Sequence, residues 1–212
     1  MEDMRRRLFL PSTLIAAAVV LIAGGQLNAL HAQTLFGVPV GGTASRLSQF
    51  GPVSGEDKYR GMDVYRWIFP NKNQFTATVD SEGEIVYLES DWFGASDDTG
   101  CDLRGLQFGV TTLADLRKRL GSKGFNFRSR RSEIQTADGL AIMTSWEVDK
   151  TVITIFTKIS TQDHARVQAP GSTESDADYA KLYAISMASP AYARNEWGAR
   201  IGEPASKKTE WK

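Results

Sequence analysis

The chain has 212 residues with 25 basic and 25 acidic side chains, two histidines and one cysteine, so its formal charge is zero. A nucleic-acid-binding surface favours an excess of basic residues and a disulfide needs two thiols, so this composition argues against both. A chain of this length can fold on its own core, as one domain or as two small domains that share a core.

The first residues carry the pattern of a secretory signal. Three arginines at positions 5–7 precede an almost wholly apolar run over residues 8–23, and a site of small residues ends at Ala32. This order predicts a signal peptide over residues 1–32 with cleavage after Ala32. The purely apolar part is shorter than the ~20 residues of a membrane span, and an uncleaved anchor stays open as the alternative.

Cleavage would remove three arginines and two acids and leave 22 basic and 23 acidic side chains. This near balance gives the mature chain little attraction for nucleic acid or anionic lipid. Positions 1–32 hold no cysteine that could be acylated, so a lipid anchor is not expected. We therefore predict a periplasmic or secreted protein that meets the membrane only transiently, through its signal peptide.

A weak internal repeat follows the signal. Phe36-Gly37-Val38 recurs as Phe108-Gly109-Val110, and each copy precedes a threonine, Thr43 or Thr112, that can cap a helix. After Thr112, Asp115 completes a capping-box pattern, and three leucines at positions 113, 116 and 120 share one helical face before Gly121. This spacing predicts a helix that opens each copy.

Strands follow each predicted helix. In the first copy they cover residues 64–69, 75–79 and 84–88, and in the second copy residues 140–148 and 151–159. The expected fold class is therefore α+β, with tandem helix-plus-antiparallel-meander repeats that place their helices on one face of a curved antiparallel sheet.

The domain organisation follows from this repeat. We predict a first α+β repeat over residues 35–90, a linker loop over 91–105 and a second α+β repeat over 106–160. Residues 161–212 form a C-terminal extension, in which we expect a short helix over 176–188, a second helix from Pro190 through Trp197, and a polar tail.

The residues of the first copy also allow a comparison with a known family. The run from Thr43 through Gly51-Pro52, the aromatic strand Tyr65-Arg66-Trp67 and the segment 79–86 with its acidic turn resemble the SmpA/OmlA envelope module. The tandem arrangement resembles the fold of the β-lactamase inhibitor protein. The resemblance covers residues 35–90 and, more loosely, 106–160, and it implies a protein-interaction role in the envelope. This chain departs from those proteins in lacking an acylated cysteine and a disulfide pair.

The chemistry-bearing residues are sparse. His164 is the only histidine after the signal, and one histidine with one cysteine cannot complete a zinc shell, so no metal or cofactor is expected. Acidic residues gather around the linker loop at Glu89, Asp91, Asp97, Asp98 and Asp102. Weak calcium binding there and a flexible acidic loop both stay open.

Two sets of residues are candidates for partner binding. The first is an aromatic sheet face with Tyr65, Trp67, Phe69 and, at the equivalent strand position of the second copy, Trp146; the alternative is that these side chains form the core. The second is a basic patch, for which a solvated helix face is the alternative. Its members are Arg117, Arg119, Arg128, Arg130 and Arg131.

These observations predict an exported, non-enzymatic protein-interaction domain of the bacterial cell envelope, whose partner is another envelope or secreted protein. The alternative is a small periplasmic hydrolase or carbohydrate-handling enzyme that uses Asp97, Asp98 and Asp102. Such an enzyme needs a cleft with two carboxylates about 5–10 Å apart. A third option is a structural part of an envelope assembly, held by the C-terminal helix.

Overall fold

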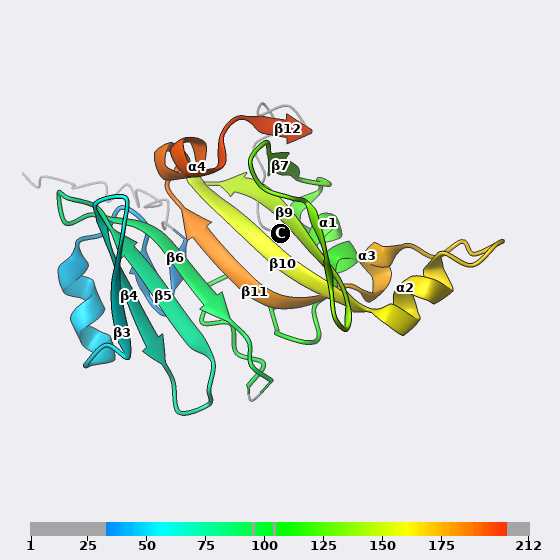
Figure 1. Ribbon diagram of the computed structural model, residues 1–212, viewed down its shortest axis with the longest axis horizontal. Coiled ribbons are helices and arrows are strands. Elements are labelled where there is room, and N and C mark those ends of the chain that lie inside the picture. Colours follow the sequence, from blue (N-terminus) through cyan, green and yellow to red (C-terminus); the bar gives the residue numbers. More distant parts are fainter. Residues whose placement is uncertain (1–32, 95, 104, 203–212) are drawn as a thin grey trace, which may run out of the picture.

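One large antiparallel sheet dominates the structure (Figure 1). The computed structural model describes residues 33–94, 96–103 and 105–202, so the predicted signal peptide over 1–32 and the polar tail over 203–212 lie outside the described residues. The ten-stranded sheet has the order β12-β7-β9-β10-β11-β6-β5-β4-β3, and β8 pairs with β9 beside this path. Its strands are β3 (Gly55–Tyr59), β4 (Met62–Ile68), β5 (Gln74–Val79), β6 (Ile85–Asp91), β7 (Phe125–Phe127), β8 (Glu133–Thr136), β9 (Gly139–Val148), β10 (Thr151–Ser160), β11 (Lys181–Ala188) and β12 (Arg200–Gly202).

The helices are short, and a small separate ribbon precedes them. This ribbon pairs β1 (Thr34–Leu35) with β2 (Val38–Pro39). The first helix, η1 (Ala44–Phe50), is a 3-10 helix, and the four α-helices have between four and eight residues. They are α1 (Leu113–Leu120), α2 (Thr161–Val167), α3 (Asp176–Tyr179) and α4 (Pro190–Trp197).

The expected helix over residues 176–188 is wrong for most of its length. Only α3 is helical, and residues 181–188 form β11, which pairs with β10 on one side and β6 on the other. Ile185 and Met187 face the main core, while Ser186 and Ala188 face the opposite side, and all four are buried. A strand that is buried on both faces has no alternation of polar and apolar residues, so its sequence does not reveal it.

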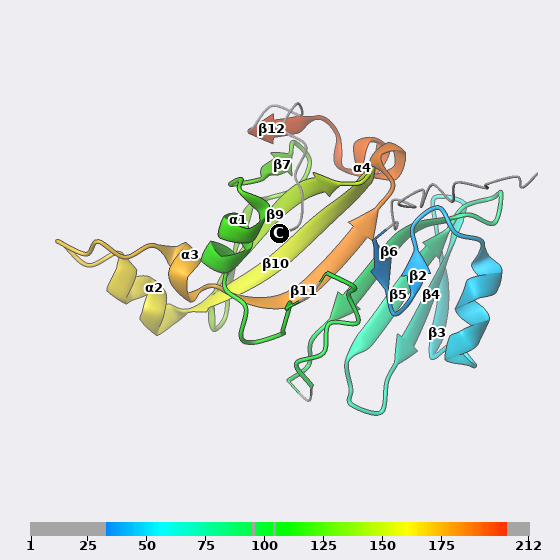
Figure 2. The same ribbon diagram turned by 180° about the vertical axis from the view of Figure 1, so that it is seen from behind.

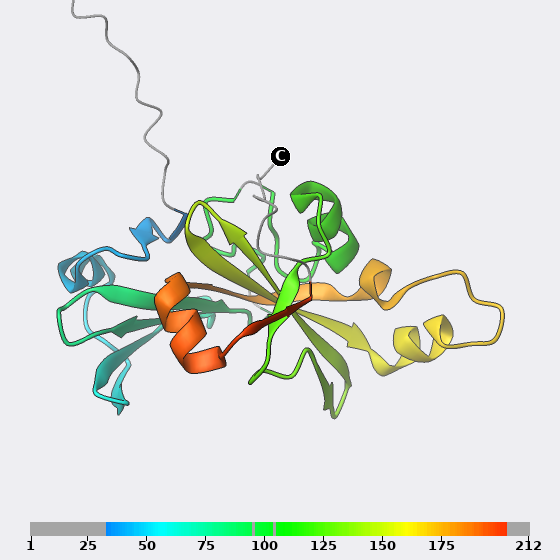
Figure 3. The same ribbon diagram turned by 90° about the horizontal axis from the view of Figure 1, so that it is seen from above.

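The expected fold class is also wrong. The chain does not form two helix-plus-meander repeats with helices on one sheet face, because β11 enters between β10 and β6 and makes one continuous sheet. The helices lie on both faces. Leucines of α1 pack in the same cluster as Ile153, whereas Trp197 of α4 packs with Val152, and adjacent residues of a strand point to opposite faces. Figures 2 and 3 show α1 and α4 on opposite sides of the sheet.

The main hydrophobic core extends beneath both halves of the sheet. It joins Phe75 and Leu88 of the first half to Leu116 and Ile153 of the second half in one cluster of buried residues. On the opposite face a smaller cluster lies under α4, where Ala193 and Trp197 pack on Phe125, Phe127, Val152 and Ala188. The sheet is therefore covered on both faces near β10 and β11, and this leaves its central strands almost fully buried.

The capping box predicted for α1 is confirmed. The Thr112 hydroxyl accepts a hydrogen bond from the Asp115 N–H at 3.2 Å, and the Asp115 carboxylate accepts one from the Thr112 N–H at 3.1 Å. The bond from the Thr112 backbone holds the pKa of Asp115 below its usual value. Gly121 ends the helix in the left-handed region with φ 60°. At the equivalent position of the first half, Thr43 makes no such cap.

This difference gives a matched test of the cap. We expect Thr112→Ala to lower the free energy of unfolding by about 1 kcal/mol, because the backbone N–H of Asp115 loses its hydrogen-bond partner. Thr43→Ala is expected to cost about half of that or less, since the Thr43 hydroxyl only contacts Ser45 at 2.8 Å. Urea unfolding of both variants measures the difference. Equal losses would show that the cap at α1 contributes nothing specific.

Candidate functional site

The predicted aromatic binding face belongs to the core. Trp67 is 3% exposed and Trp146 is 1% exposed, so neither side chain can anchor a partner at the surface. Tyr65 and Phe69 are half-buried and pack against the same core cluster. The expected exposed aromatic face is therefore wrong, and these side chains belong to the core instead. They are covered because η1 and the ribbon of β1 and β2 place further aromatic side chains, such as Phe36 and Phe50, over these rings.

The predicted basic patch is divided between the two faces of the sheet. Arg117 and Arg119 lie on α1, and Arg119 donates to the carbonyl of Gly105 at 3.0 Å. Arg130 lies on the opposite face, where its guanidinium is 4.3 Å from the ring centre of Trp197 and 5.3 Å from that of Phe156. Only Arg128 and Arg131 are exposed. These five side chains therefore do not form one surface for an anionic partner.

Two acidic residues of the linker loop accept hydrogen bonds from neighbouring residues of the chain, and a third, Asp102, is exposed. Asp97 accepts a hydrogen bond from the Gln107 side chain at 2.9 Å, and Asp98 accepts one from the Gly100 N–H at 2.9 Å. Burial raises the pKa of the neighbouring Cys101 thiol to about 12, which keeps it protonated and unreactive. Within the described ranges no three His, Cys, Asp or Glu residues are grouped as metal ligands would be.

The structure instead brings together a pocket of about 650 Å³ that no sequence motif indicated, which we call the end pocket. Its floor is the end of the central strands, with Ala141, Lys158, Lys181 and Tyr183. The other walls come from the tip of the β8–β9 hairpin, from the start of α2 with the end of α3, and from the linker loop with the segment that follows it as far as Gly109. These segments contribute Thr136, Asp138, Ser160, Asp163, Tyr179, Trp92, Gly94 and Gly109.

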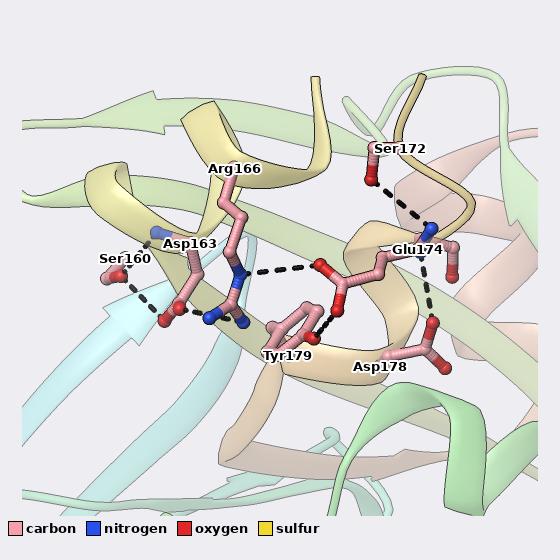
Figure 4. Close-up of polar contacts among 8 residues, drawn as sticks. Ser160, Asp163, Arg166, Ser172, Glu174, Asp178 and Tyr179 are labelled. Carbon is pink, nitrogen blue, oxygen red and sulfur yellow. Dashed lines mark hydrogen bonds and ion pairs between the residues drawn. The ribbon is translucent and has the colours of Figure 1, made fainter. Parts of the chain in front are cut away.

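A network of polar contacts holds one wall of the end pocket in place (Figure 4). Arg166 of α2 lies 3.3 Å from Glu174 and 3.4 Å from Asp163, and its guanidinium stacks 4.2 Å from the ring centre of Tyr179. Glu174 in turn accepts a hydrogen bond from the Tyr179 hydroxyl, which raises the pKa of Tyr179. The Tyr179 ring is therefore fixed at its hydroxyl and on one face.

His164, the single histidine of the predicted mature chain, has a structural contact in the same region. Its Nδ1 lies 2.9 Å from the Asp176 carboxylate and links α2 to α3. Together with the Arg166 network, this contact fixes the short helices against each other, although neither helix is long enough to be stable alone. The wall of the end pocket formed by α2 and α3 is thus held by Arg166, Glu174, His164 and Asp176, which do not line the pocket themselves.

The charges that line the end pocket are mostly paired. The Lys158 ammonium lies 2.6 Å from Asp138 and holds the pKa of that carboxyl below its usual value. Asp163 accepts a hydrogen bond from Ser160 at 2.8 Å and is paired with Arg166. Lys181 is exposed and, within the part of the chain that the structure describes, has no ion pair. One positive charge at the pocket is therefore available.

The linker loop closes the pocket with Trp92. Its ring stacks on Phe108 at 6.3 Å, and its indole N–H is buried with no hydrogen-bond partner among the described residues. Gly109, with φ 69°, lies so close that a Cβ there would be 2.4 Å from the Trp92 ring. Any larger residue at position 109 would displace this wall, so the repeated Phe-Gly-Val motif has a packing role in its second copy.

A half-buried acidic pair lies near Tyr183 of the end pocket. Glu89 and Asp91 of β6 are in hydrogen-bond contact, and burial together with the charge of Asp91 raises the pKa of Glu89 to about 8. The pKa of Asp91 is also raised, mainly by burial. Tyr183, which lines the end pocket, feels the charge of both carboxyls, and Arg130 faces Glu89. We call Glu89, Asp91 and Arg130 the inner cluster.

Sequence reasoning named Glu89 and Asp91 only as members of an acidic loop. Their alternation on one strand face after Tyr87 was the available signal, because carboxyls at positions i and i+2 of a strand point the same way. No sequence signal marked Lys158, Tyr179, Lys181 and Tyr183, since a single charged or aromatic residue near the end of a strand or helix is common at any protein surface.

No helix among the described residues has the length and apolar character required to cross a bilayer. No protein-family model matches the chain, and no curated protein matches it. Two solved structures are similar to it. One is a DUF4309 family protein from Bacillus subtilis, with 14% identity and a TM-score of 0.39 over 72% of this chain and 82% of that chain.

The other is an extracellular protein containing an SCP domain from Bacillus anthracis, with 9% identity and a TM-score of 0.39. That similarity covers 79% of this chain and 50% of the other protein, so this chain matches about half of its length. Both TM-scores lie below 0.5, and a likeness at this level carries no argument about the activity of the chain.

Proposed function

We propose that this chain is an exported, non-enzymatic interaction domain of the bacterial cell envelope that holds part of another envelope component in the end pocket. The proposal of export, to the periplasm or the medium, rests on the signal pattern over residues 1–32. The observation that carries the binding role is the end pocket itself. Its volume of about 650 Å³ lies within the range of ~300–1,000 Å³ that small-ligand sites occupy.

The composition of the pocket supports binding. Three aromatic side chains, Trp92, Tyr179 and Tyr183, provide apolar contact area, and a few polar groups between them can fix the orientation of a ligand. The fixed position of Tyr179 reduces the conformational entropy that a ligand would otherwise have to remove. Another envelope or secreted protein, the partner expected from the sequence, is one component that could present a group to this pocket.

The contacts of the chemistry-bearing groups support a non-enzymatic role. Asp97 accepts a hydrogen bond from Gln107 and Asp98 accepts one from Gly100, and His164 links two helices. Glu89 and Asp91 contact each other, whereas glycoside hydrolysis needs two carboxyls about 5–10 Å apart. The hydrolase alternative with Asp97, Asp98 and Asp102 therefore has less support than binding.

A pair of neighbouring substitutions tests the proposal. We expect Thr136→Trp to fill the end pocket and abolish the capture of envelope material, while Gln135→Trp leaves capture unchanged. The pair is matched, because both native side chains donate to the Gly139 carbonyl, at 2.9 and 3.0 Å, but only Thr136 lines the pocket. The immobilised protein is incubated with a bacterial envelope extract, and the retained material is identified by mass spectrometry.

The thermal midpoint of each variant shows that it is folded before capture is compared. Equal capture by the wild type and both variants, or no capture by the wild type, would contradict a binding role for the end pocket.

A further inference from the structure

We infer that the end pocket takes an acidic saccharide, with a sugar ring against its aromatic wall and the carboxylate of the sugar at Lys181. This inference rests on the proposed binding function and names the ligand class of the same site. It combines three features of the lining: a fixed aromatic wall, hydrogen-bond donors placed next to carboxylate acceptors, and one unpaired positive charge.

The aromatic wall suits a sugar ring. A pyranose has an apolar face of C–H groups, and a tyrosine or tryptophan ring covers such a face while its polar edge stays hydrogen-bonded. Tyr179 meets this requirement, because Glu174 holds its hydroxyl and Arg166 covers one face of its ring. Tyr183 and Trp92 extend the aromatic lining from the floor to the linker loop.

The polar groups suit hydroxyls. A sugar hydroxyl donates one hydrogen bond and accepts others, so it needs donors and acceptors side by side. The end pocket presents such mixed groups twice, as the Ser160 hydroxyl beside the Asp163 carboxylate and as the Lys158 ammonium beside the Asp138 carboxylate. Each pair is already held by its own contact, at 2.8 and 2.6 Å, and so is preorganised.

The charges select a single carboxylate. Asp138 is paired with Lys158, and Asp163 shares Arg166 with Glu174, so among the described residues that line the pocket Lys181 is the cation that has no carboxylate partner and can meet a ligand. The single ammonium of Lys181 can balance only one of the two negative charges of a phosphate dianion. A monoanionic sugar meets Lys181 alone, and a charge-assisted hydrogen bond to a carboxylate is stronger than a neutral one.

The test is calorimetric titration of the purified protein with three probes. The first is a linear tetramer of galacturonic acid, the second is its methyl ester, which keeps the rings and loses the charge, and the third is tetraglutamate, which keeps the charge and has no ring. We expect the acidic tetramer to bind about tenfold more tightly than its ester, because a hydrogen bond to a charged group is lost.

Two lysine variants locate this difference. Lys181→Gln is expected to weaken binding of the acidic tetramer about tenfold and to leave binding of the ester unchanged, which is the signature of a direct pair in a double-mutant cycle. Lys118→Gln, on the exposed part of α1, is expected to bind both probes as the wild type does. Circular dichroism confirms that both variants are folded.

The outcomes separate this inference from the proposed function. If the ester binds as tightly as the acid, if Lys181→Gln weakens both equally, or if tetraglutamate binds as well as the sugar, the acidic-saccharide assignment is overturned. It is also overturned if no probe binds while Thr136→Trp still abolishes capture of envelope material, and in that case the proposed function stands. If Thr136→Trp captures like the wild type, the proposed function itself fails.

Discussion

Replacement of Trp67 by alanine is expected to lower the free energy of unfolding by about 3–5 kcal/mol. The indole is 3% exposed and lies 5.4 Å from the ring centre of Phe50 and 5.6 Å from that of Phe75. It also donates a hydrogen bond to the Gly51 carbonyl at 3.3 Å, which ties the end of η1 to β4. Alanine would leave a cavity in the main core and an unpaired carbonyl beside it.

Two further variants separate these causes. Trp67→Phe keeps a ring in the cluster and removes the hydrogen bond, so we expect a loss of about 1–2 kcal/mol. Ile68→Ala changes the next residue of β4, which points away from the core and is 55% exposed, and is expected to cost less than about 0.5 kcal/mol. Urea unfolding measures all three. A loss for Trp67→Ala no larger than that for Ile68→Ala would place the indole outside the core.

The elements that the sequence predicted well are those with local signals. The helix after Thr112 has a capping box, three leucines on one face and Gly121, and all of these signals lie within ten residues. The two-residue gap between the predicted strands 140–148 and 151–159 was an equally local signal, and its residues, Asp149 and Lys150, adopt the positive φ, 46° and 64°, that a two-residue hairpin requires. Such features depend little on the rest of the chain.

The elements that the sequence did not predict depend on distant partners. β11 has strand neighbours from both halves, β10 and β6, and its burial on both faces removes the alternation that identifies a strand. Once this strand enters the centre, two separate repeats cannot form, and the expected fold class fails with it. The orientation of Trp67 was undecidable for the same reason, since only the tertiary contacts of η1 show which face of β4 is covered.

The end pocket was out of reach of sequence reasoning for a geometric reason. Its lining residues are spread over separate segments between residues 92 and 183, and no sequence motif spans two of these segments. What brings them together is the position of β11, which sets Lys181 and Tyr183 beside Lys158 of β10. Because residues 181–188 were expected to be helical, neither the correct topology nor the candidate site could be predicted.

The inner cluster leads to the second large effect, a dependence of stability on pH that Glu89 controls. Burial and the neighbouring Asp91 raise the pKa of Glu89 from 4.5 to about 8 in the folded chain, while the unfolded chain keeps the lower value. Below pH 4.5 both states hold the proton. Between about pH 4.5 and 8 the folded state binds a proton that the unfolded state has released, so stability falls as the pH rises.

The slope for one proton is at most about 1.4 kcal/mol per pH unit. Glu89→Gln removes this titration, and its amide can still donate to Asp91. We therefore expect the free energy of unfolding of the variant to fall less than that of the wild type between pH 5 and 8. At pH 8.5 the variant should be more stable than the wild type by an amount on the order of a few kcal/mol. Urea unfolding at a series of pH values measures both curves.

Glu56→Gln is the matched control, because Glu56 is exposed on the edge strand β3 and its replacement should follow the wild-type curve. The comparison cancels the other titrating groups, which the variants share with the wild type. If Glu89→Gln and Glu56→Gln give the same pH dependence, the Glu89 carboxyl is not held protonated by its surroundings. If only Glu89→Gln shows a weaker dependence of stability on pH, the inner cluster holds a proton beside Tyr183 at neutral pH. The sheet face next to the end pocket then carries one negative charge fewer than its sequence suggests.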